Sequence, residues 1–468
     1  MIVLELSSPV SSRSITPFGV PVKRAGARAP VAAFQPLPTA IAPGKVKFST
    51  RLGMGLVFLM FSMLHQIQSM LMGVNLYLLY FFAVPALAAV VFTGGIQRAF
   101  RGRPAIYWTG FAVCIFLAAP FSTWPGGSVT LLMDYFRTSL PVMFVIAGLV
   151  TTWRDCKGIM SVIAASAAIN VLSARLFQGD DKFGGRVGLS LGTVANPNDY
   201  AGHLLLVLPF LVWVLLSSKS FVLRIGAGVA FSYGIYLILG TASRGAVIGL
   251  AIGGLVFFVT GTARQRFVVA IALPVGVAVL LSTVSGSALR RITSFTAADA
   301  NVYAEGAEAL ESSASREYLL KTSLLYIVQH PVFGVGPGQF KTYEGTHNTF
   351  IGGHGEWHDT HNAYTQAASE CGIPAFLFFL AGIVSTFRLM IGTRRVARLQ
   401  PGCQDLVTAT NCAIVGFSAF CTAIIFLNFA YFFYLPAMGG FAVALATGAK
   451  DELRSRAVLV GPQTTGRL

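Results

Sequence analysis

Residues 201–217, AGHLLLVLPFLVWVLLS, form an apolar run without a single charged side chain. A helix needs about 20 apolar residues to cross the hydrocarbon layer of a membrane. Comparable apolar runs follow at 221–240, 245–261, 267–283 and 372–387. These runs predict helices, because a segment surrounded by lipid has to satisfy its backbone hydrogen bonds internally.

The composition of the whole chain supports this interpretation. Of its 468 residues, 54% are hydrophobic and only 11% are charged, and the mean hydropathy is +0.69. An ordinary soluble domain carries about twice that share of charged residues. We therefore predict an all-α polytopic integral membrane protein with about 12 transmembrane helices. Helices one to nine are expected within 51–284 and helices ten to twelve within 371–448, followed by a cytoplasmic tail at 449–468.

The formal net charge of +16 has two possible meanings. In a soluble protein it would suggest a nucleic-acid partner. With the N-terminus inside, however, the basic clusters of this chain fall on one side of the membrane, as the positive-inside rule requires. These clusters are Arg98, Arg101 and Arg103; Arg154 and Lys157; Arg264 and Arg266; and Arg394, Arg395 and Arg398. We therefore expect the lipid bilayer, and no nucleic acid, as a partner.

Neither the first 50 residues nor the cysteines predict a functional site. The first 50 residues carry Pro, Ala, Ser and basic residues without a continuous apolar core. This composition predicts a disordered cytoplasmic tail, with no cleaved signal peptide. The six cysteines show no CxxC motif and no pairing pattern, so a disulfide framework is not expected.

The longest polar segment, residues 285–370, is predicted to be one large extracytoplasmic loop. It holds nine of the 18 acidic residues and five of the seven histidines. Within it, 316–330 is typical of an amphipathic helix that ends before Pro331, with apolar residues at helical spacing: Leu320, Leu324 and Ile327. Such a helix would lie on the outer membrane surface or roof a cavity. The next ten residues, PVFGVGPGQF, predict an ordered turn.

Two arginines on the outer side are candidates for binding phosphate. Arg244 lies in GTASRGAVIG between two apolar runs, and Arg316 opens the amphipathic helix. The planar guanidinium fork matches phosphate oxygens, so two such groups suit a diphosphate. The structural alternatives are a snorkelling arginine for Arg244 and a salt bridge to Glu317 or Glu311 for Arg316.

The histidines of the loop suggest either a metal site or proton transfer. His354 and His358 are four residues apart, but HGEWH does not match the HExxH pattern, and the neighbouring glycines disfavour a rigid helix. His361 stands where the chain re-enters the membrane, and a neutral imidazole there can accept a proton from an attacking hydroxyl. The alternative for His361 is a structural histidine at a helix start. The sequence contains no nucleotide-binding signature, and NPND at 196–199 is explained by helix capping.

Four segments together resemble the O-antigen ligase and polymerase family of bacterial envelope polysaccharide assembly. They are NPNDYAG at 196–202, SRG at 243–245, SREYLL at 315–320 with HPVFGVGPGQF at 330–340, and HNAYTQAASECG at 361–372. The ligase signature has a histidine and a small polar residue, then nine intervening residues and a glycine, as in His361, Asn362 and Gly372. The later Gly, Thr or Tyr of that signature is Ala375 here, so ligase and polymerase both stay open.

The resemblance implies a glycosyltransferase in the bacterial inner membrane with its active site facing the periplasm. Its donor would be a polyprenyl diphosphate-linked glycan, and its acceptor a sugar hydroxyl on a glycan or lipid-linked sugar. Arg244 and Arg316 would bind the diphosphate and His361 would assist the acceptor. Asn362, Asn198 and Tyr364 are expected to contact substrate. The family is thought to need no metal, and no cofactor is implied.

Three other activities fit the same residues. A flippase or transporter of lipid-linked oligosaccharide also places arginines within a helical bundle, although the chain has no detectable repeat. A related transferase would attach the glycan to a serine or threonine of a protein. A metallohydrolase would use the histidine cluster and would lose activity with chelators.

Overall fold

The computed structural model describes residues 47–177, 186–189, 194, 196–263, 265–267, 286, 290, 304–347, 355 and 357–459. These residues fold into helices joined by short turns, and no strand occurs among them, so the predicted all-α class is confirmed. The predicted N-terminal tail up to residue 46, nearly all of the predicted span at 267–283 and most of 285–303 lie outside the described residues. So do residues 348–354, which include His354, and 460–468.

Seven helical segments in the described part of the chain are long and apolar enough to cross a membrane. They are α5 with its 3-10 extension (Arg103–Phe121), α6 to α7 (Pro125–Leu149), α8 (Trp153–Phe177), α9 (Pro197–Ser217), α10 (Phe221–Gly240), α17 (Ala363–Arg398) and α18 with its extension (Gln404–Phe426). An eighth is possible if α1 (Phe48–Ser62) and α2 (Leu64–Met72), bent by 64°, form one broken span. The protein is thus a multi-pass membrane protein, whereas the predicted number of about twelve stays a prediction.

The other described helices are shorter or less apolar. They are α3 (Leu78–Phe92), α4 (Gly95–Phe100), α11 (Arg244–Thr260), α15 (Ala304–Gln329), α16 (Phe340–His347) and α19 (Tyr434–Leu459). Helix α15 ends one residue before His330-Pro331, as the position of the proline predicts. Helix α19 continues through residues 449–459, which the sequence had assigned to the C-terminal tail.

The segment from Pro125 to Leu149 begins earlier than the apolar pattern indicates. The sequence predicts a span from 139 to 153, and Asp134 and Arg137 stand before it. In the structure those two side chains pair with each other on the helix surface, and a π-helical turn at Tyr135–Ser139 joins α6 to α7. Pro125 starts the helix, as proline can in a first turn.

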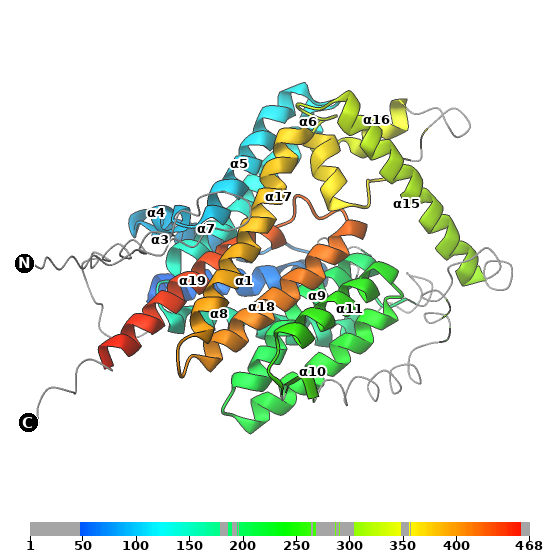
Figure 1. Ribbon diagram of the computed structural model, residues 1–468. Coiled ribbons are helices and arrows are strands. Elements are labelled where there is room, and N and C mark those ends of the chain that lie inside the picture. Colours follow the sequence, from blue (N-terminus) through cyan, green and yellow to red (C-terminus); the bar gives the residue numbers. More distant parts are fainter. Residues whose placement is uncertain are drawn as a thin grey trace, which may run out of the picture. The chain divides into compact units, whose positions relative to one another are not determined.

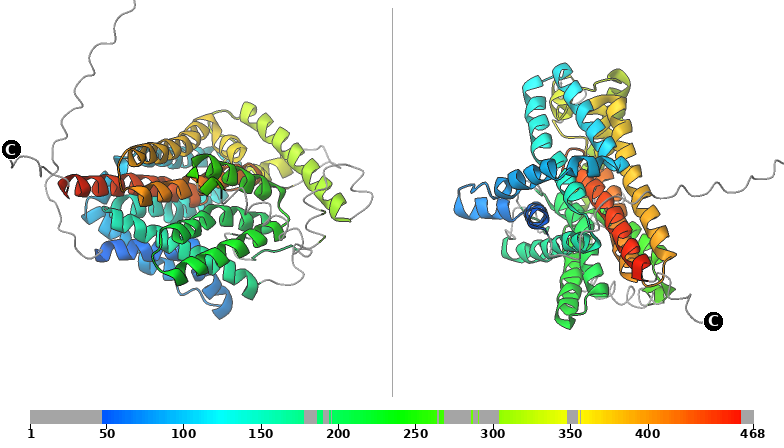
Figure 2. Two further views of the ribbon diagram at one scale, coloured as in Figure 1. Left: turned by 60° about the horizontal axis from the view of Figure 1, so that its bottom comes forward. Right: turned by 90° about the vertical axis from the view of Figure 1, so that its left-hand side faces the viewer.

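Helix α17 crosses the front of the helices in Figure 1 and contacts α5, α18 and α19. Helix α18 also packs against α9 and α11. Gly249 and Gly253 of α11 lie directly against Ala419 of α18, and small residues four apart allow two helices in a membrane to approach closely. Figure 2 shows the same packing from two further directions.

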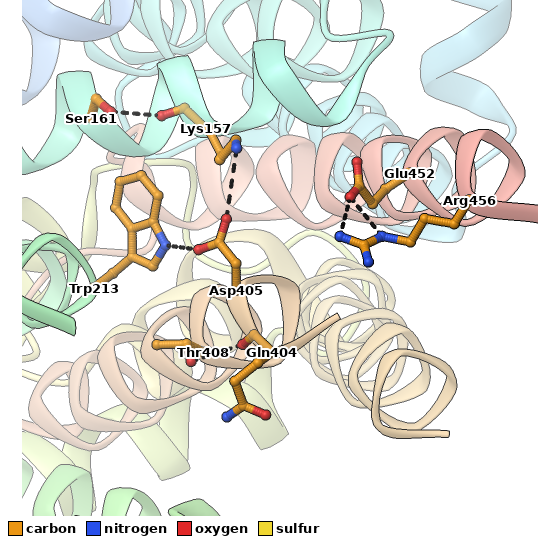
Figure 3. Close-up of polar contacts among 8 residues, drawn as sticks. All are labelled: Lys157, Ser161, Trp213, Gln404, Asp405, Thr408, Glu452 and Arg456. Atoms are coloured by element: carbon orange, nitrogen blue, oxygen red, sulfur yellow. Dashed lines mark hydrogen bonds and ion pairs between the residues drawn. The ribbon is translucent and has the colours of Figure 1, made fainter. Parts of the chain in front are cut away.

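Polar contacts join the ends of three spans on the side where α8 and α18 begin (Figure 3). Lys157 of α8 lies 3.7 Å from Asp405 of α18, and Trp213 of α9 donates to the same carboxylate at 3.3 Å. The ion pair is half-exposed and therefore contributes little stability by itself. The contact does show that these ends of α8, α9 and α18 lie together, on the side that is predicted to be cytoplasmic.

Helix α17 contains a break that a separate turn stabilises. Gly372 has φ 82° and ψ 174°, which interrupts the helix. The turn at 331–340 docks there: Val335 N donates to Ser369 O at 2.9 Å, and Ile373 N donates to Pro331 O at 2.8 Å. The buried carboxylate of Glu370 accepts from two further backbone N–H groups of the turn, at Gly338 and Phe340. The ordered turn predicted from PVFGVGPGQF is confirmed.

We expect the Gly372→Ala variant to be strongly destabilised. Alanine is strained at φ 82°, by about 1–3 kcal/mol, and its Cβ would lie 2.2 Å from the carbonyl oxygen of Val332, which adds a comparable overpacking term. Gly392→Ala on the same helix is the matched control, because a Cβ there meets nothing within 4 Å and removes a helix-interior glycine. Thermal unfolding in detergent should show a lowered Tm for G372A and an unchanged or raised Tm for G392A. Equal Tm values would contradict this account.

Candidate active site

Three helices begin at the end of the bundle opposite Lys157 and Asp405: α9, α11 and α17. Asn196 caps α9 and accepts from the backbone N–H groups of Asn198 and Asp199. Asn362 caps α17 in the same way, with Tyr364 N at 2.9 Å and Thr365 N at 3.2 Å. The capping predicted at 196–199 is therefore confirmed. Helix N-termini carry partial positive charge, so this end of the bundle favours an anion.

Arg244 is the first residue of α11 and reaches across to α15. Its Nη2 donates to Ser313 Oγ at 2.5 Å. Arg316 follows Ser313 by three residues, so it occupies the same face of α15 one turn later. The structure thus brings the two predicted arginines to the same interface. Ala242, just before this helix, has φ 51°, a conformation that is strained for alanine and that recurs at functional sites.

His361 is half-buried and close enough to Arg316 for their charges to interact. Burial, with smaller contributions from the positive charges of Arg316 and His358, lowers the pKa of His361 to about 4. The imidazole is therefore neutral at physiological pH, the form that can accept a proton. His361 also has φ 49°, so the residue immediately before the cap of α17 is held in a strained conformation.

The other predicted substrate-binding residues make contacts within the protein. Asn362 caps α17, and Asn198 Oδ1 accepts from Arg186 Nη2 at 3.0 Å. Tyr364 donates its hydroxyl to the Cys421 carbonyl of α18 at 2.9 Å. These contacts fix the positions of the three side chains near His361 and Arg244. Their role in binding substrate stays a prediction.

Arg186 belongs to this region, and the sequence reasoning missed it. Its Nε donates to Thr241 O at 2.8 Å while its Nη2 holds Asn198, so it joins the start of α9 to the turn that precedes Arg244. Asp199 and Asp359 also meet here, close enough for their charges to interact. The sequence offered only a lone arginine in GRVGLSLGTVANPNDYAG, which indicates nothing about its partners 12 and 55 residues away.

A buried carboxylate holds α15 in place over the site. Glu344 of α16 accepts from the Tyr318 hydroxyl at 2.8 Å and from Trp357 N at 2.8 Å. It therefore connects α15, which carries Arg316, to the segment that carries His361. Glu317, the partner considered for Arg316, pairs instead with Lys321 at 2.7 Å on the exposed side of the helix.

No metal site is formed by the described residues, since no three His, Cys, Asp or Glu side chains among them lie close enough to share an ion. This statement does not cover the candidate pair of His354 and His358, because His354 lies outside the described residues. In the described part of the chain, Arg244 contacts Ser313 of α15, and Arg316 of the same helix is close enough to His361 for their charges to interact.

Comparison with known proteins finds one matching family. The family model described as O-antigen ligase matches residues 229–380, a range that contains α11, α15, the turn at 331–340 and His361. No curated protein matches the chain. The match confirms the resemblance found in the motifs, although Arg186 and Asn198 lie before its start. Over residues 229–380 the chain is thus similar to the O-antigen ligase family.

Proposed function

We propose that this glycosyl-transferring membrane enzyme moves a glycan from a polyprenyl diphosphate carrier to a sugar hydroxyl, on the outer face of the bacterial inner membrane. The observation that carries the proposal is the convergence of Arg244, Arg316 and a neutral His361. One group of residues thereby offers two positive charges for the leaving group and one proton acceptor for the attacking group. No nucleotide is needed, because the donor is already activated as a diphosphate ester.

The arginines act on the leaving diphosphate. When the bond between the anomeric carbon and the diphosphate oxygen breaks, negative charge develops on that oxygen. Guanidinium groups fixed beforehand stabilise this charge without reorganising at the moment of reaction. Arg244 is held by Ser313, and Arg316 lies on a helix braced by Glu344, so both are positioned in advance. The three helix N-termini add to the same positive potential.

His361 acts on the acceptor. The acceptor hydroxyl oxygen forms the new bond to the anomeric carbon, its proton passes to the imidazole, and polyprenyl diphosphate leaves. An imidazole with a pKa of about 4 is neutral before the donor binds. The negative diphosphate raises that pKa in the complex, which makes the imidazole a stronger base when it is needed. We propose that the described chemistry requires no metal.

The placement of the site on the outer face is supported by charges at the far ends of the same helices. Helix α11 begins at Arg244 and ends at Thr260, whose carbonyl accepts from Arg394 near the end of α17. Arg394, Arg395 and Arg398 therefore lie at the end opposite His361. The positive-inside rule assigns that basic end to the cytoplasm and the candidate site to the periplasm.

Purified protein in liposomes tests the proposal. With a polyprenyl diphosphate-linked oligosaccharide and a sugar acceptor, we expect transfer of the glycan and release of polyprenyl diphosphate without nucleotide and in the presence of EDTA. A lipid A core acceptor would reveal a ligase, a second carrier-linked repeat a polymerase, and a serine or threonine peptide a protein transferase. Movement of intact donor across the bilayer without bond formation would instead establish a flippase. Activity that EDTA abolishes would contradict the metal-independent mechanism.

A further inference from the structure

Helix α15 has two apolar faces, and only one of them packs against the protein. The inward face carries Ser313, Arg316, Leu319 and Tyr326 at helical spacing, and the last two are buried against α16 and the turn. The outward face carries Leu324, Leu325 and Val328, which are 51%, 52% and 77% exposed. Two residues of the apolar stripe predicted from the sequence, Leu320 and Leu324, are 39% and 51% exposed.

The exposed face of α15 continues into the lipid-facing surface of the spans. Val332, just after the helix, is 54% exposed, and the neighbouring Pro331 carbonyl accepts from Ile373 N at 2.8 Å. Ile373 opens the long part of α17, whose Leu377 is also exposed. Figure 1 shows one end of α15 beside this end of α17, with the rest of α15 slanting away from it. Exposed apolar side chains therefore continue from the transmembrane helix α17 through Val332 to the end of α15.

A second contact connects this surface to α5. Phe333 stacks on Phe121 with ring centroids 4.2 Å apart, and Phe121 is itself exposed at the end of that span. Trp124 follows and is 59% exposed. A tryptophan with one face apolar and one N–H group is typical of the boundary between hydrocarbon and headgroups.

We propose that the end of α15, from Leu324 to Val328, lies in the outer leaflet of the bilayer with Leu324, Leu325 and Val328 against the acyl chains. We choose lipid over a second copy of the chain as the occupant of this face, because the face continues into the exposed apolar surface of α17 and α5. The charged pair of Glu317 and Lys321 lies on the exposed side one turn or more before Val328, where headgroups and water meet the helix.

This placement has a consequence for the donor, which rests on the proposed function. Arg316 precedes Leu324 by eight residues, or about 12 Å along the helix axis. A helix that enters the leaflet at its end therefore holds Arg316 at the depth of the headgroups. The diphosphate of a membrane-bound carrier can then reach the arginine while its lipid stays in the bilayer.

Fluorescence quenching in single-copy nanodiscs tests the placement. The Cys114→Ser background removes the one native cysteine that is not buried, and an NBD label is then introduced with Leu325→Cys or Val328→Cys. Leu377→Cys on α17 is the membrane control and Lys321→Cys the polar control. We expect nitroxide lipids to quench labels at 325 and 328 as strongly as at 377 and at least twofold more than at 321. Iodide should show the reverse order.

Strong iodide quenching at 325 and 328 would overturn the proposal, because it would place this face in water. Protection from both quenchers in liposomes together with iodide access in single-copy nanodiscs would also overturn it and would identify a second copy as the occupant. The measurement requires no donor and no activity. Its failure is therefore distinguishable from a failure of the proposed glycosyl transfer.

Discussion

Replacing His361 with alanine is expected to lower kcat for glycan transfer by about 10²–10⁴-fold, the range typical of a lost general base. The donor KM should change little, because the two arginines that hold the diphosphate remain. The reason is geometric: His361 lies beside Arg316 and is neutral at physiological pH. The measurement is initial rate against donor concentration in proteoliposomes.

The pKa of His361 also predicts the direction in which activity changes with pH. Only neutral imidazole accepts the proton, so activity is lost as the pH falls through the pKa of His361. For kcat/KM, which reports the free enzyme, that pKa is about 4, and the profile should stay flat from pH 8 to about 5.5. For kcat, which reports the donor complex, the acid limb should lie at higher pH, because the bound diphosphate stabilises imidazolium.

His347→Ala is the matched control for His361. His347 belongs to α16, is exposed and stacks on Tyr343, away from the arginines. Its replacement should leave kcat within a factor of two. If H361A kept full activity, or lost it together with a collapse of thermal stability, the role of His361 as base would have to be abandoned for the structural alternative, a histidine that orders the start of α17.

Much of the helical framework could be predicted from local sequence. Apolar runs reveal most spans, because every helix that crosses the lipid needs about 20 mostly apolar residues. Pro331 fixes the end of α15, and Asn196 fixes the start of α9. These features depend on residues within one or two turns of each other, which a single sequence displays directly.

The features that the sequence did not reveal depend on distant partners. Arg186 is placed by a carbonyl at Thr241, and the turn at Val335 accepts from Thr123, 212 residues earlier. The start of the span at α6 is not evident from the sequence, because Asp134 and Arg137 look like an interruption of the apolar run. In the structure these two side chains pair with each other on the helix surface. Periodicity alone could not tell which side of α15 packs inward, because Leu319 on the buried side and Leu324 and Val328 on the exposed side are all apolar.

Replacing Arg316 or Arg244 should also strongly reduce the rate of glycan transfer. Each of the variants Arg316→Ala and Arg244→Ala is expected to lower kcat/KM by about 10²–10³-fold, comparable to losing one donor of an oxyanion hole. Lysine at either position should restore only part of this, since it keeps the charge without the fork. The double variant should lose less than the product of the single losses, because both groups act on one diphosphate.

Lys321→Ala on the same helix is the control, because its exposed pairing with Glu317 contributes little. Its rate should stay within a factor of two. Arg316→Ala carries one further signature: since the charge of Arg316 lowers the pKa of His361, its removal should move the acid limb of kcat/KM to higher pH. A merely structural arginine could lower the rate through misfolding, but then the surviving activity would keep its original pH profile. An unshifted limb in a folded R316A variant would therefore separate Arg316 from His361 and remove the basis for a shared site.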